Sequence, residues 1–189
     1  MRSRGFAVGI GVNLGDRTGQ FDLAIRLLAG TPGIEVLEAA TPIRTSPVVS
    51  EGEKSRHPWY LNSVVVGSTT LSPRALMGRL LAIETVVGRR RRGGCDPRTL
   101  DLDLVILEGT VIDEVGIRIP HPRLAGRTFV LEPLAEVLDL SRERGGQLLL
   151  NQRSGRAAVQ VSTPGIMLDD GSIERRVRLV RPMESQGLP

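Results

Sequence analysis

The 189-residue sequence has little cysteine, lysine or aromatic content and no long apolar run. Its one cysteine, Cys95, excludes an internal disulfide framework and suits a reducing compartment. No apolar stretch approaches the length needed to cross a membrane, and Met1-Arg2-Ser3-Arg4 is not followed by the hydrophobic region of a signal peptide. We therefore expect a cytoplasmic protein without a membrane partner.

Lys54 is the only lysine, so nearly all the basic residues are arginines. No glycine frame precedes Lys54, which excludes a Walker-type phosphate loop. Gly9, Gly11 and Gly15 match a dinucleotide fingerprint only loosely, and no Ser-His-Asp or Cys-His spacing indicates nucleophilic catalysis. Because arginine makes planar, bidentate contacts with carboxylate and phosphate, the places where arginines cluster carry the information.

Apolar periodicity predicts one core built from alternating strands and helices, followed by a C-terminal extension. Strands are expected at 6–12, 36–44, 60–66 and 99–107, with a short partner strand at 111–112. Helices are expected over 21–28 and 73–87, and Pro133 places the expected start of a last helix near Glu132. The order of these elements is that of a ferredoxin-like (split βαβ) α+β fold, whose mostly antiparallel sheet has its helices on one face.

The extension begins where the periodicity weakens, after Asp139. We expect one domain over 1–140 and an extension over 141–189. Short apolar pieces at 148–150, 157–161 and 177–180 are candidate edge strands, and no function is assigned to this part of the chain.

Two carboxylates, Asp101 and Asp103, stand two residues apart within the predicted strand at 99–107. Residues i and i+2 of a strand share a face, so both carboxylates should point away from Leu100, Leu102 and Leu104. At a separation of about 6 to 7 Å, two such charges repel by about 2 to 3 kcal/mol at an effective dielectric near 20. A cation must offset this repulsion, and the strand alone leaves open whether it is Mg²⁺ completed by substrate phosphates or nearby arginine.

Arginines gather close to this pair, in the run from Arg89 to Arg92 and at Arg98. A run at a helix C-terminus gains from the helix dipole without any function, but beside paired carboxylates it suits polyphosphate binding. His121, between two prolines, is a candidate for a nucleotide contact or proton donor, or else an ordinary surface residue. Tyr60 and Phe129 could hold a flat aromatic ligand between them, or simply fill the core.

Six separated segments together resemble the 6-hydroxymethyl-7,8-dihydropterin pyrophosphokinases, in the family's order and nearly at its spacing. They are Gly11-Val12-Asn13-Leu14-Gly15-Asp16, Arg44-Thr45-Ser46-Pro47-Val48, Tyr60-Leu61-Asn62, Glu84 with Gly88-Arg89, Pro97-Arg98-Thr99-Leu100-Asp101-Leu102-Asp103, and Pro120-His121-Pro122-Arg123 with Arg127 and Phe129. The resemblance implies Mg²⁺-dependent transfer of pyrophosphate from ATP to the dihydropterin in folate biosynthesis, with release of AMP. It also implies two Mg²⁺ ions, small-molecule substrates, no nucleic-acid partner and a monomer.

The same resemblance implies a role for each matching residue. The metal ligands are Asp101 and Asp103. The pterin contacts are Thr45, Pro47, Val48, Tyr60, Asn62, Asp101 and Phe129. The ATP contacts are Glu84, Arg89, Arg91, Arg98, Leu104, His121 and Arg127. The residues implied in catalysis are Arg89, Arg91, Arg98, Asp101 and Asp103.

Two alternatives remain open at this point. Cys95-Asp96 and Gly94 depart from the family pattern in the arginine loop, which leaves room for a member with altered or lost pterin activity. A basic ferredoxin-like module could instead bind RNA, but that function needs exposed aromatic residues on the central strands, where this chain has aspartates.

Overall fold

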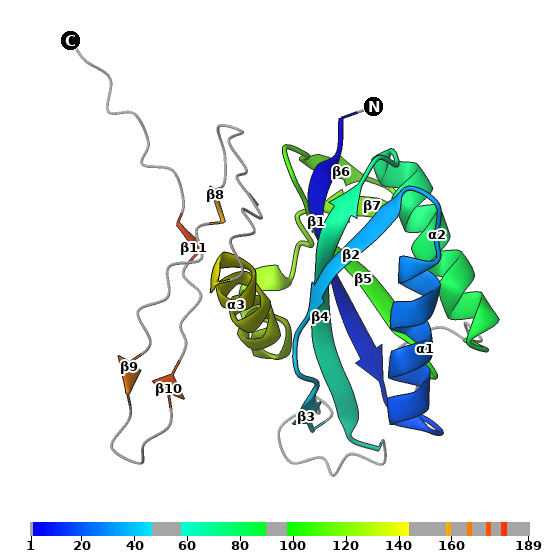
Figure 1. Cartoon of the computed structure of the whole chain (residues 1–189), viewed down its shortest axis with the longest axis vertical. Coiled ribbons are helices and arrows are strands. Elements are labelled where there is room, and N and C mark those ends of the chain that lie inside the picture. Colours follow the sequence, from blue (N-terminus) through cyan, green and yellow to red (C-terminus); the bar gives the residue numbers. More distant parts are fainter. Residues whose placement is uncertain are drawn as a thin grey trace.

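The computed structural model describes residues 2–46, 58–89 and 98–143, together with four two-residue strands in the C-terminal part (Figure 1). Pro47, Val48, Arg91 and the candidate strand at 148–150 lie outside the described residues. The elements in chain order are β1 (Arg4–Val12), α1 (Arg17–Ala29), β2 (Ile34–Ala39), β3 (Ile43–Thr45), β4 (Tyr60–Thr69), α2 (Pro73–Val86), β5 (Asp101–Leu107), β6 (Ile112–Glu114), β7 (Ile117–Ile119), the 3₁₀ helix η1 (Leu124–Gly126) and α3 (Thr128–Glu143).

The central sheet has the strand order β2-β4-β1-β5, with β3 as an additional partner of β4. Each of these pairings is antiparallel. The chain order β1-α1-β2-β4-α2-β5, combined with this strand order, is the ferredoxin-like arrangement of an α+β fold. The predicted fold class and the mainly antiparallel sheet are therefore confirmed.

Helices α1 and α2 begin at side chains that cap their free amide groups. Asp16 accepts a hydrogen bond from the backbone N–H of Gly19, and Ser72 accepts one from Ala75, with Pro73 in the first turn of α2. Both helices lie on the same side of the sheet (Figure 1). Their apolar side chains pack there against alternate residues of the strands, which include Phe6, Val8, Leu100, Leu102 and Leu104.

The third helix, α3, lies on the opposite face of the sheet, so the expectation that the helices share one face does not extend to it (Figure 1). The reason is the second set of apolar residues on the central strands, such as Val64, Val66 and Val105, which would otherwise face water. Val130 and Leu134 of α3 bury against this set. Asp101 and Asp103 of β5 belong to this same face, and the candidate site is built around them.

Two details of the sequence prediction are wrong. Helix α3 begins at Thr128 rather than near Glu132 and contains Pro133 in its interior, because the burial of Val130 outweighs the one hydrogen bond that proline cannot make. The short strand after Gly109 pairs with β7 rather than with β5, forming a separate hairpin.

In the C-terminal part, Ala158–Val159 (β8) pairs with Leu179–Val180 (β11), and Ile166–Met167 (β9) pairs with Ile173–Glu174 (β10). These are short two-stranded sheets, separate from the central sheet. Among the described residues, none of the helices combines the length and apolar character of a membrane span.

Candidate active site

Asp101 and Asp103 open strand β5 and point to the same face of the sheet, as predicted from their spacing. Their side chains are 23% and 33% exposed, whereas Leu102 and Leu104 between and after them are buried on the other face. The two carboxylates therefore stand at the surface above a packed core. Carboxylate oxygens at a partly open position are the donors that Mg²⁺ prefers, with further ligands left to water and phosphate.

Strand β1 contributes glycines beside these carboxylates. Its register places Gly11 between Asp101 of β5 and Asn62 of β4, and places Gly9 opposite Asp103. A Cβ atom on Gly11 would lie only 3.1 Å from Oδ1 of Asn62. The central strand thus supplies a floor without side chains, and the aspartates and Asn62 flank it. No group of three or more His, Cys, Asp or Glu residues arranged to hold a metal occurs in the described ranges, so the aspartate pair would need ligands from substrate.

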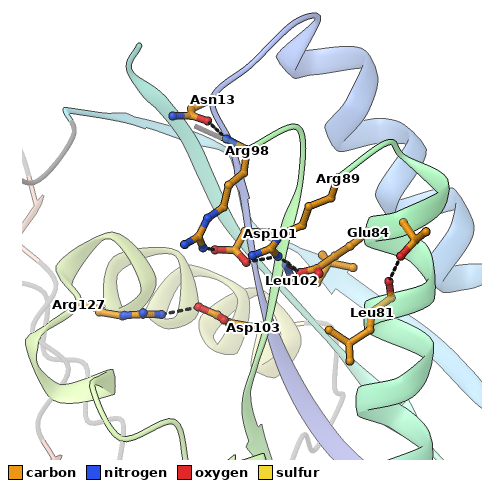
Figure 2. A network of polar contacts seen from close by, with 10 residues as sticks. Asn13, Leu81, Glu84, Arg89, Arg98, Asp101, Leu102, Asp103 and Arg127 are labelled. Carbon is orange, nitrogen blue, oxygen red and sulfur yellow. Dashed lines mark hydrogen bonds and ion pairs between the residues drawn. The ribbon is translucent and has the colours of Figure 1, made fainter. Parts of the chain in front are cut away.

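Three arginines contact the two aspartates (Figure 2). Nη1 of Arg89 bonds Oδ1 of Asp101, and Nη1 of Arg98 bonds Oδ2 of the same carboxylate. Nη1 of Arg127 bonds Oδ2 of Asp103. Arginine, one of the two cations that the strand left open, therefore contacts both carboxylates.

Glu84 of α2 joins the helix to the start of β5. The residue is 2% exposed, and its Oε1 accepts a hydrogen bond of 2.8 Å from the backbone N–H of Leu102 and a charged one from Arg89. Arg89 is therefore held between Glu84 and Asp101, with its side chain only 11% exposed. Charge-assisted hydrogen bonds of this kind fix geometry as well as charge. The predicted contact of Glu84 with ATP stays a prediction.

The backbone before Asp101 is held by two residues to which the sequence analysis gave no role. Asn13 is fully buried, and its Oδ1 accepts a 2.6 Å hydrogen bond from the backbone N–H of Arg98 (Figure 2). The backbone N–H of Asn13 donates in turn to the carbonyl oxygen of Arg98. In the orientation that satisfies its amide, Gln20 donates to the carbonyl oxygens of Thr99 at 2.9 Å and Leu14 at 2.7 Å. A buried asparagine in the turn after a strand was the available signal for the first contact; nothing in the sequence indicates the second.

The electrostatics of Arg98 and His121 follow from their neighbours. Burial would lower the pKa of Arg98, but the charge and hydrogen bond of Asp101 outweigh it, so this pKa is raised. The pKa of His121 is lowered, first by burial and then by the positive charge of Arg127. Nδ1 of His121 accepts a 3.1 Å hydrogen bond from the N–H of Arg123, which leaves Nε2 to carry the proton of the neutral ring.

Those residues predicted to bind pterin that the structure describes lie on the same face as the aspartates. Asn62, 6% exposed, donates from Nδ2 to Oγ1 of Thr45 at 2.7 Å, and Tyr60 precedes it by two positions on β4. Phe129 lies in the first turn of α3, with the guanidinium carbon of Arg127 5.7 Å from its ring centre. Arg127 therefore connects Phe129 to Asp103.

Leu104, another predicted ATP contact, is buried at 1% exposure on the face covered by α1 and α2. A contact with nucleotide there would have to involve its backbone. The structure thus brings Glu84, Arg89, Arg98 and Arg127 to the aspartates and keeps the Leu104 side chain apart from them.

Comparison with known proteins relates this chain to one family. The family model described as 7,8-dihydro-6-hydroxymethylpterin-pyrophosphokinase matches residues 7–139. A Methylorubrum extorquens protein named 2-amino-4-hydroxy-6-hydroxymethyldihydropteridine pyrophosphokinase is 36% identical over 130 residues, which are 69% of this chain and 80% of the relative. A Synechocystis protein of the same name is 36% identical over 173 residues, 90% of this chain and 86% of the relative. The Arabidopsis thaliana protein named "Folate synthesis bifunctional protein, mitochondrial" is 36% identical over 131 residues, 69% of this chain and 23% of that longer protein.

Proposed function

The chain belongs to the 7,8-dihydro-6-hydroxymethylpterin-pyrophosphokinase family, and on this premise we propose how its residues carry out the reaction. It is a pyrophosphokinase of folate biosynthesis, and as a kinase it takes ATP as co-substrate. The acceptor is the hydroxymethyl group of 6-hydroxymethyl-7,8-dihydropterin. Its oxygen forms a bond to the β-phosphorus of ATP, the bond from that phosphorus to the oxygen bridging to the α-phosphate breaks, AMP leaves, and the hydroxyl proton passes to solvent.

The observation that supports this proposal most strongly is the single row across the sheet formed by Asp101, Gly11 and Asn62. It puts an oxygen donor for a metal on one side of an uncovered strand and an amide for a flat polar ligand on the other. A pterin against Asn62 would therefore have its substituent directed toward the aspartates. Alignment of this kind accounts for a large part of the acceleration in phosphoryl transfer.

Asp101 and Asp103 are the residues that would hold Mg²⁺, and two ions fit the family's reaction. When bound, Mg²⁺ supplies charge neutralisation on the phosphate oxygens and lowers the cost of bringing the nucleophile to phosphorus. The donor set fits the ion because both carboxylates are partly exposed and share one face.

The arginines bind the phosphates and take up the charge that develops on leaving AMP. Arg89 is fixed from behind by buried Glu84, which suits a residue that must hold one orientation throughout the reaction. Arg98 and Arg127 are each attached to a carboxylate and lie at the open side. Neutral His121, whose Nε2–H is a donor, contacts the nucleotide as a hydrogen-bonding group rather than as an acid.

Phe129 and Tyr60 stack on the two faces of the pterin, and Asn62 and Thr45 contact its polar edge. The hydrogen bond between Asn62 and Thr45 orients the amide before substrate arrives. The domain of 1–140 carries the whole described site, and the protein acts as a monomer on two small molecules.

Stoichiometric product analysis tests the proposal. Full-length protein with MgCl₂, ATP and 6-hydroxymethyl-7,8-dihydropterin should form AMP and the pterin diphosphate in equal amounts, separated by anion-exchange chromatography. The matched control is 6-methyl-7,8-dihydropterin, which lacks the acceptor oxygen and should yield no AMP. Formation of ADP, or no nucleotide turnover at saturating pterin, would contradict the proposal.

A further inference from the structure

The arginines occupy the same carboxylate oxygens that would bind metal. Both oxygens of Asp101 are hydrogen bonded, one by Arg89 and one by Arg98, and Oδ2 of Asp103 is bonded by Arg127. Mg²⁺ coordinates directly to carboxylate oxygen at about 2.0–2.1 Å, and a guanidinium on the same carboxylate repels the ion and neutralises the charge that would attract it. Metal and arginine therefore compete for these side chains.

Within the described part of the chain, the charges in contact at the aspartates balance. Glu84, Asp101 and Asp103 contribute three negative charges, and Arg89, Arg98 and Arg127 contribute three positive ones. A divalent cation that approaches alone meets no net attraction and must displace a cation from each carboxylate. A polyphosphate changes the balance because it offers the guanidinium groups a second anion of matching geometry.

Of Arg89 and Arg127, which bond different aspartates, Arg127 is the better placed to exchange partners. Arg89 keeps buried Glu84 when it leaves Asp101, so it stays where it is. Arg127 is bonded to Asp103, which is 33% exposed, and its guanidinium lies over the face of Phe129 rather than over a second carboxylate. Moving from Asp103 to a phosphate exchanges one anionic partner for another, so the guanidinium of Arg127, whose side chain is 17% exposed, is not left without a counter-charge.

We infer that Arg127 competes with free metal for Asp103 and so lowers the affinity of the site for a lone divalent cation. Arg127 releases the carboxylate only when a polyphosphate binds its guanidinium group. Metal and nucleotide then bind with positive coupling, and by linkage each strengthens the other equally. This inference rests on the proposed function for the identity of the polyphosphate, but the competition itself depends only on the contacts of Arg127.

The test titrates Mn²⁺ into nucleotide-free full-length protein and counts free Mn²⁺ by electron paramagnetic resonance. The variant Arg127→Met should bind Mn²⁺ at least about fivefold tighter than the parent, a change in the direction opposite to ordinary loss of a site residue. Its affinity for ATP, measured by calorimetry, should fall. Arg127→Gln, with a shorter polar side chain, gives a second variant with the same expected sign.

Two matched controls separate competition from loss of any positive charge. Arg123, like Arg127, contributes to the positive field at His121, but it is exposed, and it bonds His121 through its backbone N–H. Arg74 pairs with Glu114 away from the site. Arg123→Met and Arg74→Met should leave Mn²⁺ affinity within about twofold, and Asp103→Asn added to Arg127→Met should abolish the gain.

Unchanged or weaker Mn²⁺ binding in folded Arg127→Met and Arg127→Gln would overturn the inference, as would an equal gain in Arg123→Met. Folding is checked by circular dichroism and thermal unfolding. Because Mn²⁺ binding here requires no turnover, a failed AMP assay with the predicted Mn²⁺ gain would refute the proposed function alone, and the reverse result would refute the inference alone.

Discussion

Glu84 offers the sharpest test of how the site is supported from within the fold. Its carboxylate accepts the backbone N–H of Leu102 at 2.8 Å and pairs with Arg89, at 2% exposure. Strand β5 is at the edge of the sheet, so this amide has no neighbouring strand to accept it and depends on α2 instead. Glu84→Met keeps roughly the volume and removes the acceptor, whereas Glu84→Gln keeps an acceptor oxygen and removes the charge.

The expected losses differ because the two variants remove different interactions. Glu84→Met leaves the Leu102 amide buried without this acceptor, which costs about 1 to 3 kcal/mol, whereas Arg89 keeps its ion pair with Asp101. We expect about 3 kcal/mol in total, at the lower end of the roughly 3 to 5 kcal/mol for a fully uncompensated buried charge. For a chain of this size that corresponds to roughly 6 to 12 °C in Tm. Glu84→Gln should lose about 1 kcal/mol.

Urea unfolding of the full-length protein, followed by far-UV circular dichroism, measures both values at unchanged m. The informative result is a lower free energy of unfolding for Glu84→Met than for Glu84→Gln. Equal losses would show that the amide of Leu102 does not depend on Glu84, and a loss under about 1 kcal/mol in Glu84→Met would refute the reasoning from the buried acceptor.

The remaining predictions concern the reacting groups and their positioning. Asp103→Asn should lower turnover at least about a hundredfold without changing the unfolding midpoint by more than a few degrees, and undiminished turnover would refute the metal assignment. Phe129→Ala should weaken pterin binding by about 1 to 3 kcal/mol, measured by calorimetry, since stacking and buried area are both lost; unchanged affinity would show that the ring serves the core. Because the pKa of His121 is lowered in the folded protein, the unfolded chain binds a proton at this histidine first as the pH falls. The stability that neutral His121 contributes is therefore present above about pH 6.5 and is lost as the pH falls below that value. His121→Asn should flatten the fall in urea midpoint between about pH 6.5 and 5. Gln20→Ala should cost about 1 to 2 kcal/mol of stability, and Gln20→Glu more, because a carboxylate would face the carbonyl oxygens of Thr99 and Leu14; a Glu variant as stable as the parent would refute the orientation of this amide.

Local patterns in the sequence were enough to predict the sheet and the orientation of the aspartates. The alternation at Asp101 and Asp103 fixes which residues share a face whatever the strand pairs with, because the side-chain period of a strand is two. Ser72 followed by proline marks the start of α2 for the same kind of local reason, since the cap and the first turn are adjacent in sequence.

The partners of the aspartates could not be predicted in this way. Arg127 reaches Asp103 from 24 positions away, and it does so because α3 packs on the aspartate face, whereas the pattern predicted all helices on the other one. Gln20 reaches Thr99 across the layer between α1 and the start of β5. Such contacts depend on which apolar face a helix covers, and that choice is made by the whole core.

The interpretation of Gly9 and Gly11 changes once their neighbours in the sheet are known. In the sequence they suggest a weak dinucleotide fingerprint, which is discounted for its register. In the sheet, Gly11 separates the carboxylate of Asp101 from the amide of Asn62, and any side chain there would begin 3.1 Å from the Asn62 oxygen. In the proposed site two substrates meet above β1, and a glycine at this position leaves room for them. With glycine at position 11, β1 pairs with both β4 and β5 through its backbone and places no side chain between Asp101 and Asn62. Only a residue without a Cβ atom allows this.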